Sequence, residues 1–155
     1  MFTGTMNRSF EIIEGFSADI SGTCVGWDDY RISNGKLFTV GIGPCLAIAI
    51  YDAKQRTGAL AHISGARRET VPKPVHPEHI IRTLVSRLQN YGNLEVFLVG
   101  EGYGDHGMSE RARRDLYLFD IPVIGEDLGS LKNHRGREVH LDCQAGIVQV
   151  YRYPY

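Results

Sequence analysis

The clearest structural signal in this chain is the segment Thr39-Val40-Gly41-Ile42-Gly43-Pro44-Cys45-Leu46-Ala47-Ile48-Ala49-Ile50-Tyr51, which is followed after a polar turn by Gly58-Ala59-Leu60-Ala61-His62. The continuous apolar run 46–51 is typical of a strand buried on both faces. Residues 52–58 are polar and turn-like, and 59–63 return as a second strand. We therefore predict an antiparallel hairpin that places Cys45 roughly opposite His62, within about two or three residues of register.

Outside this hairpin, the chain alternates short strands with two helices. Apolar residues at helical spacing predict a helix that begins at Pro77 and ends at Gly92, and a second helix capped by Ser109. A turn is predicted at 125–129, and an extended connection at 70–77. Strands are expected within 11–25 and at 37–40, 95–99, 121–124, 138–141 and 147–151. The pattern predicts a compact mixed α/β domain that is rich in strands.

Size and composition narrow the class of protein. A chain of 155 residues predicts a single domain, 1–155, with a loose N-terminal segment at 1–10. The net charge of −1 does not indicate nucleic-acid binding. The arginines within 111–114 are flanked by acidic residues and are expected to form a solvated helix face. No segment is apolar enough to insert into a membrane, and no signal-peptide pattern precedes residue 10. Three widely spaced cysteines do not form a secreted disulfide framework, so we expect a cytoplasmic protein.

Cys45 and His62 supply the minimum set for a thiol nucleophile. The thiolate is the reactive form of cysteine, and a neighbouring imidazolium lowers the pKa of a thiol. The turn containing Gly41, Gly43 and Pro44 can leave backbone N–H groups facing a developing oxyanion. Thr39 is suited to orient the imidazole by a hydrogen bond, which is the third role in a catalytic triad.

Each of these residues also has a structural interpretation. A free cysteine is commonly a small buried hydrophobe, and a histidine on an apolar strand is commonly a satisfied core residue. Thr39 is a β-branched residue of the kind that strands favour. On the residues alone, catalysis and core packing both remain open for Cys45, His62 and Thr39.

Other motifs carry less chemistry. The segment 100–107 is rich in glycine but lacks the lysine and hydroxyl of a phosphate loop, so we expect it to shape a site entrance. His76 and His79 lie beside prolines at a helix start and are expected to be solvent-exposed rather than metal ligands. Core packing is favoured for Cys24, and Cys143 lies near a turn. We predict no metal site and no cofactor.

Taken together, residues 39–62 resemble the core motif of the CheD family of chemoreceptor glutamine deamidases. The shared features are the threonine, the glycine-rich turn into Cys45, the apolar strand, the Asp-led turn and His62, which follows Cys45 by 17 positions. The segments 126–129, 137–139 and 146–148 are similar to the C-terminal part of that family. The resemblance implies an α+β fold, namely an α/β/β/α sandwich of mixed sheets flanked by helices. It also implies that Cys45, His62 and Thr39 are the catalytic set.

The resemblance leads to two hypotheses of different class. The first is a cysteine-dependent protein-glutamine deamidase that acts on a glutamine-bearing protein, with a chemoreceptor as candidate substrate. The second is a catalytically inactive binding module that regulates a signalling partner, because Pro44 stands where the family usually has serine and removes a backbone N–H. A weaker third option is a metal-dependent hydrolase that uses Cys45, His62 and another histidine.

Overall fold

The computed structural model describes residues 9–64, 76–88, 93–102, 107–130 and 134–154. Within these ranges the chain forms two helices and ten strands. In chain order they are β1 (Phe10–Glu14), β2 (Thr23–Cys24), β3 (Asp29–Ser33), β4 (Lys36–Ile42), β5 (Leu46–Asp52), β6 (Thr57–Ile63), α2 (Pro77–Leu88), β7 (Leu94–Gly100), α3 (Met108–Leu118), β8 (Val123–Leu128), β9 (His134–Asp142) and β10 (Ile147–Pro154).

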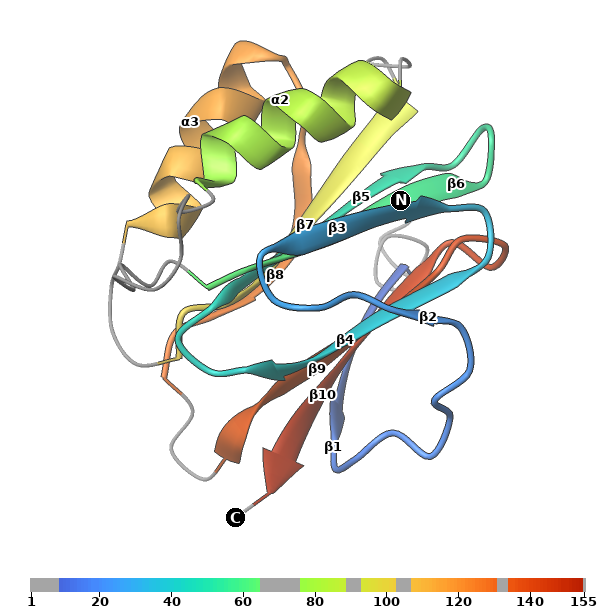
Figure 1. Cartoon of the computed structure of the whole chain (residues 1–155), viewed down its shortest axis with the longest axis vertical. Coiled ribbons are helices and arrows are strands. Elements are labelled where there is room, and N and C mark those ends of the chain that lie inside the picture. The colour runs from blue at the N-terminus through green and yellow to red at the C-terminus, as the bar shows by residue number, and fades with distance from the viewer. Residues whose placement is uncertain (1–8, 65–75, 89–92, 103–106, 131–133, 155) are drawn as a thin grey trace, which may run out of the picture.

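The strands form two stacked five-stranded sheets. One sheet has the order β3-β6-β5-β7-β8 and is called the helix-side sheet, because α2 and α3 pack against it. The other has the order β1-β10-β9-β4-β2 and is called the outer sheet. Figure 1 shows the three layers, with the helices above the helix-side sheet and the outer sheet below it. Both sheets mix parallel and antiparallel pairs, so the predicted α+β sandwich of mixed sheets is confirmed. In the described residues both helices cover the same sheet, so the second helical layer of the expected α/β/β/α arrangement is not seen there.

Strand β5 is the centre of the fold. Alternate side chains point to opposite faces of a strand, so its two faces can enter two separate cores. Leu46, Ile48 and Ile50 pack beneath the helices, whereas Ala47 and Ala49 face the outer sheet. Every residue of β5 is buried, which confirms the strand predicted to be covered on both faces.

The start of α2 agrees with the prediction, whereas the start of α3 does not. Helix α2 begins at Pro77 as predicted, whereas its predicted end at Gly92 lies outside the described residues. Helix α3 is not capped by Ser109, because Gly107 occupies the cap position in a left-handed conformation. The Ser109 amide and hydroxyl instead donate to the carboxylate of Glu101, at 2.8 and 2.6 Å. Among the described helices, none has the length and apolarity needed to cross a membrane.

Two further predictions are wrong. The segment predicted to turn at 125–129 is largely strand β8, because Val123–Leu128 pairs in parallel with β7. Cys24 is exposed rather than packed in the core, because β2 has two residues and lies at the edge of the outer sheet. Cys143, which the sequence left open, is fully buried. The predicted loose segment 1–10 and extended connection 70–77 lie mostly outside the described residues.

Candidate active site

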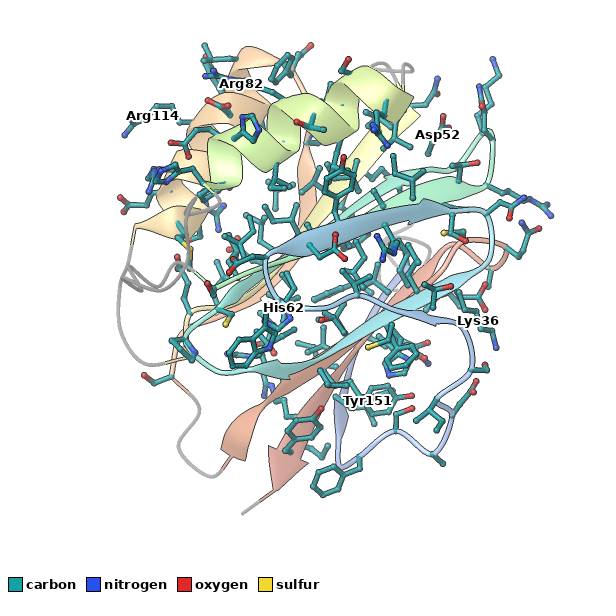
Figure 2. All side chains as sticks on the ribbon, in the orientation of Figure 1. Lys36, Asp52, His62, Arg82, Arg114 and Tyr151 are labelled. Atoms are coloured by element: carbon teal, nitrogen blue, oxygen red, sulfur yellow. The ribbon has the colours of Figure 1, made fainter. Side chains whose placement is uncertain are left out.

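Three elements bring the candidate residues together at one end of the sandwich. Thr39 lies in β4, Cys45 ends the turn between β4 and β5, and His62 lies near the end of β6. His62 is directly opposite Ala47 in the β5–β6 ladder, which is two residues from the predicted partner Cys45. Since side chains alternate along a strand, Cys45 and Ala47 share the face toward the outer sheet. Figure 2 shows His62 between the two sheets.

The hydroxyl of Thr39 determines which nitrogen of His62 carries the proton. Thr39 Oγ1 lies 2.7 Å from the carbonyl oxygen of Val25 and 2.7 Å from Nδ1 of His62. A hydroxyl has a single hydrogen, and a carbonyl can only accept. Thr39 therefore donates to Val25 and accepts from Nδ1–H of His62. This assignment leaves Nε2 of His62 with a lone pair.

The His62 ring is neutral at neutral pH. Both His62 and Thr39 are fully buried, and Nε2 has no hydrogen-bond partner within the described part of the chain. Burial lowers the pKa of His62 to about 4, and the nearby charge of Asp28 opposes that shift only in part. At neutral pH the imidazole is therefore a base with a free acceptor, and not the positive partner of a thiolate.

The turn before Cys45 is fixed by backbone hydrogen bonds. The Gly43 N–H donates to the Gly41 carbonyl at 3.1 Å, so this amide is occupied inside the turn. The Glu101 N–H donates to the Cys45 carbonyl at 2.8 Å, and the Gly102 N–H donates to the Gly43 carbonyl at 2.7 Å. The described part of the glycine-rich segment therefore lies against the turn that carries Cys45. This position is consistent with the prediction that the segment shapes the entrance of the site.

A buried arginine supports this loop from the other side. Arg137 is 1% exposed and donates to the carbonyl oxygens of Gly100 and Gly129, at 3.3 and 2.8 Å. Its Nε lies 3.0 Å from the carboxylate of Asp127. The same carboxylate forms a second ion pair with Arg152, at 2.7 Å. The two guanidinium groups hold the pKa of Asp127 below its usual range, although its burial acts in the opposite direction. Asp127 and Arg137 lie in segments that resemble the C-terminal part of the family, but their pairing could not be predicted, because the charges of the cluster come from three separate strands.

Sequence reasoning also missed Trp27 and Asp28, which precede β3. The Trp27 ring centroid lies 6.1 Å from that of His62, with the planes tilted by 46°. The Asp28 N–H donates to the His62 carbonyl at 2.6 Å. The one available signal was composition, because Trp27 is the only tryptophan of the chain.

The other candidate ligands do not gather. His76 and His79 are exposed near the start of α2, as predicted. Within the described ranges, no group of three or more His, Cys, Asp or Glu side chains is arranged to hold a metal ion. No residue of the site is therefore assigned to a metal.

Similarity to known proteins decides the family. No profile of a known protein family matches the chain. The probable chemoreceptor glutamine deamidase CheD of Methanosarcina barkeri is 32% identical over 130 residues, which cover 72% of this chain and 82% of the relative. The chain belongs to the CheD family. The resemblance found in residues 39–62 is thereby confirmed.

Further CheD proteins match over a longer part of the chain. The chemoreceptor glutamine deamidase CheD of Thermotoga maritima is 26% identical over 144 residues, covering 81% of this chain and 88% of the relative. The probable CheD of Clostridium tetani is 27% identical over 148 residues, with 81% and 88% covered. The similarity to CheD proteins therefore extends well beyond the cysteine and histidine motif.

Proposed function

We propose that this protein is a cysteine-dependent protein-glutamine deamidase, with Cys45 as nucleophile, His62 as general base and Thr39 as the residue that orients His62. The single observation that carries the proposal is the pairing of Thr39 Oγ1 with Nδ1 of His62 at 2.7 Å, which leaves Nε2 available on the face that Cys45 shares. Membership of the CheD family supports the same reaction, because the relatives are named glutamine deamidases.

The reaction begins with attack on the amide. As Nε2 of His62 takes the thiol proton, the Cys45 sulfur forms a bond to the carboxamide carbon of a glutamine side chain. The C–N bond then breaks, and the departing nitrogen takes the proton from His62 and leaves as ammonia. A thioester between Cys45 and the former glutamine remains.

The second half of the reaction releases glutamate. His62 takes a proton from water as the water oxygen attacks the thioester carbon. The C–S bond breaks, and the proton returns to the sulfur of Cys45. The negative oxygen in both steps needs backbone donors next to the sulfur. We propose that backbone amides of the turn 43–45 supply them, although Pro44 has no N–H and Gly43 donates its own to the Gly41 carbonyl.

The proposed substrate is a glutamine-bearing protein. The relatives are named for chemoreceptors, and we extend that substrate class to this chain. We place the reaction in the cytoplasm, where thiols are kept reduced, because the mechanism needs Cys45 as a free thiol. A regulatory protein that controls access to the site is a further proposed partner.

Mass spectrometry of a purified chemoreceptor signalling fragment tests the proposal. Incubation with the wild-type protein should convert specific glutamines to glutamate, whereas Cys45→Ala should abolish conversion. Cys24→Ala is the matched control, because Cys24 is exposed on an edge strand and plays no part in the mechanism. Conversion by Cys45→Ala at the wild-type rate would disprove the assigned nucleophile. A wild-type protein that converts no glutamine would instead favour the inactive binding module.

A further inference from the structure

Trp27 is a large aromatic side chain at the surface beside a fully buried catalytic base. It is 54% exposed, whereas His62 is fully buried. The ring centroids are 6.1 Å apart, so the indole lies close to the imidazole while much of it still faces solvent. A substrate that approaches His62 from this side meets the indole first.

The same indole extends toward the turn before Cys45. Gly41 has a φ of +70° and no side chain, and a Cβ built there would lie 4.0 Å from Nε1 of Trp27. One edge of Trp27 is therefore near the turn that carries the nucleophile, and its ring is near the base. Trp27 thus borders both halves of the candidate active site.

The segment that carries Trp27 is held on both sides. The Val25 N–H donates to the Phe38 carbonyl at 2.8 Å, and the Asp28 N–H donates to the His62 carbonyl at 2.6 Å. The Asp28 carboxylate also accepts the Ser64 amide at 2.9 Å and the Ser64 hydroxyl at 2.8 Å. Because Asp28 is hydrogen-bonded to His62 and Ser64, the backbone that carries the indole is anchored beside the strand of His62.

A glutamine side chain suits a wall of this kind. It consists of two methylene groups and a flat, neutral carboxamide, which can lie against an apolar aromatic face. Glutamate carries a carboxylate, and placing that charge against the indole, beside a buried neutral imidazole, removes part of its hydration without supplying a cation. The same surface therefore accepts the substrate and disfavours the product.

We propose that Trp27 is the substrate-binding wall of the active site, which packs on the glutamine side chain and selects the neutral amide over the carboxylate. This inference rests on the deamidase function proposed above and adds a specificity-determining residue to it. Its separate consequence is a binding signal that does not require turnover.

Indole fluorescence provides that signal directly, since Trp27 is the only tryptophan of the chain. The Cys45→Ala protein is titrated with N-acetyl-Ala-Gln-Ala-amide and, in parallel, with the matched peptide that has glutamate in place of glutamine. We expect a saturable change in Trp27 emission with the glutamine peptide and at least about tenfold weaker binding of the glutamate peptide. No change with either peptide, or equal affinity for both, would overturn the inference.

Kinetics of Trp27 variants give a second, independent readout. With the same glutamine peptide, Trp27→Ala should raise KM about tenfold while kcat changes by less than about threefold, and Trp27→Phe should lie between. Tyr117→Ala is the control, because Tyr117 is 85% exposed on α3 and should leave both constants unchanged. An unchanged KM, or a loss confined to kcat, would show that Trp27 does not bind substrate.

The two experiments separate failure of this inference from failure of the proposed function. A wild-type protein that deamidates the peptide while Trp27→Ala keeps its KM contradicts only the role of Trp27. A wild-type protein without deamidase activity contradicts the proposed function. The fluorescence titration then still decides whether Trp27 binds a neutral side-chain amide.

Discussion

Thr39 holds His62 in the tautomer that carries its proton on Nδ1 and leaves a lone pair on Nε2. Its hydroxyl lies between the Val25 carbonyl and Nδ1 of His62, 2.7 Å from each, inside the closed space between the two sheets. Because the carbonyl cannot donate, the direction of both hydrogen bonds is determined. The backbone of Val25 thus fixes the protonation state of a side chain 37 positions away in sequence.

Two substitutions of Thr39 distinguish the effect of its hydroxyl group from the effect of its side-chain shape. Thr39→Val keeps the shape but leaves the Val25 carbonyl and His62 Nδ1–H without this partner, so we expect a loss of about 1–3 kcal/mol in the free energy of unfolding. We also expect kcat/KM to fall by about tenfold to a hundredfold, because His62 loses its orientation. Thr39→Ser keeps the hydroxyl and should retain most activity. Urea denaturation and steady-state kinetics measure both effects, and equal behaviour of the two variants would exclude the role given to the hydroxyl.

The buried His62 predicts how stability depends on pH. Its pKa falls from 6.5 to about 4 on folding, so the folded state favours the neutral ring. Above pH 6.5 the contribution of the neutral His62 ring to the stability of the folded state is fully present. As the pH falls from 6.5 toward 4, the unfolded chain binds a proton that the folded protein does not, and stability is lost. Between pH 7 and pH 5 we expect His62 to contribute a loss of about 2 kcal/mol in the free energy of unfolding.

Urea denaturation at pH 7 and pH 5 measures this loss. His62→Gln is the matched variant, because it has no group that titrates in this range and should lose less stability over the same interval. NMR of the imidazole nitrogens locates the pKa of His62 directly. A pKa near 6.5, or equal pH dependence in the two proteins, would contradict the assignment of a buried neutral base.

Gly100 must remain without a side chain, because it lies directly against the backbone of Cys45. A Cβ at Gly100 would lie 2.1 Å from the Cys45 carbonyl oxygen, and the residue has a φ of +135°. We expect Gly100→Ala to lower the free energy of unfolding by about 3 kcal/mol or more, because the loop and the Cys45 turn must move apart. The control is Gly15→Ala, where φ is +115° but no atom lies within 4 Å. This control should cost about 1–2 kcal/mol in backbone strain. Similar losses in the two variants would show that the contact with Cys45 is unimportant.

The sequence predicts the centre of this fold better than its edges. A short, uninterrupted apolar run such as 46–51, bounded by turn residues, favours a strand that is buried on both faces, and the structure agrees. The two-residue strand β2 has no such pattern, so Cys24 was placed in the core when it lies at an edge. Gly125 and Gly129 favour a turn at 125–129, but most of that segment lies in β8, whose pairing with β7 overrides the local preference.

The candidate site was predictable in its residues but not in its geometry. The types and spacing of Cys45 and His62 indicate a thiol site, whereas the two-residue offset in the ladder is decided by pairing along the whole of β5 and β6. Trp27 could not be placed, because its proximity to His62 depends on how β3 pairs with β6. Contacts of this kind arise from tertiary structure and leave no periodic pattern in the sequence.

Replacing Asp127 should destabilise the protein far more than replacing its neighbour Glu126. Asp127 is buried and receives Arg137 and Arg152, whereas Glu126 is exposed on the same strand and pairs with Arg113. Asp127→Asn leaves a charged Arg137 in the core without its counter-ion, so we expect a loss of about 3–5 kcal/mol in the free energy of unfolding. Glu126→Gln removes an exposed ion pair and should cost less than about 1 kcal/mol. Thermal and urea denaturation of both variants measure the difference, and losses of equal size would show that Arg137 does not depend on Asp127.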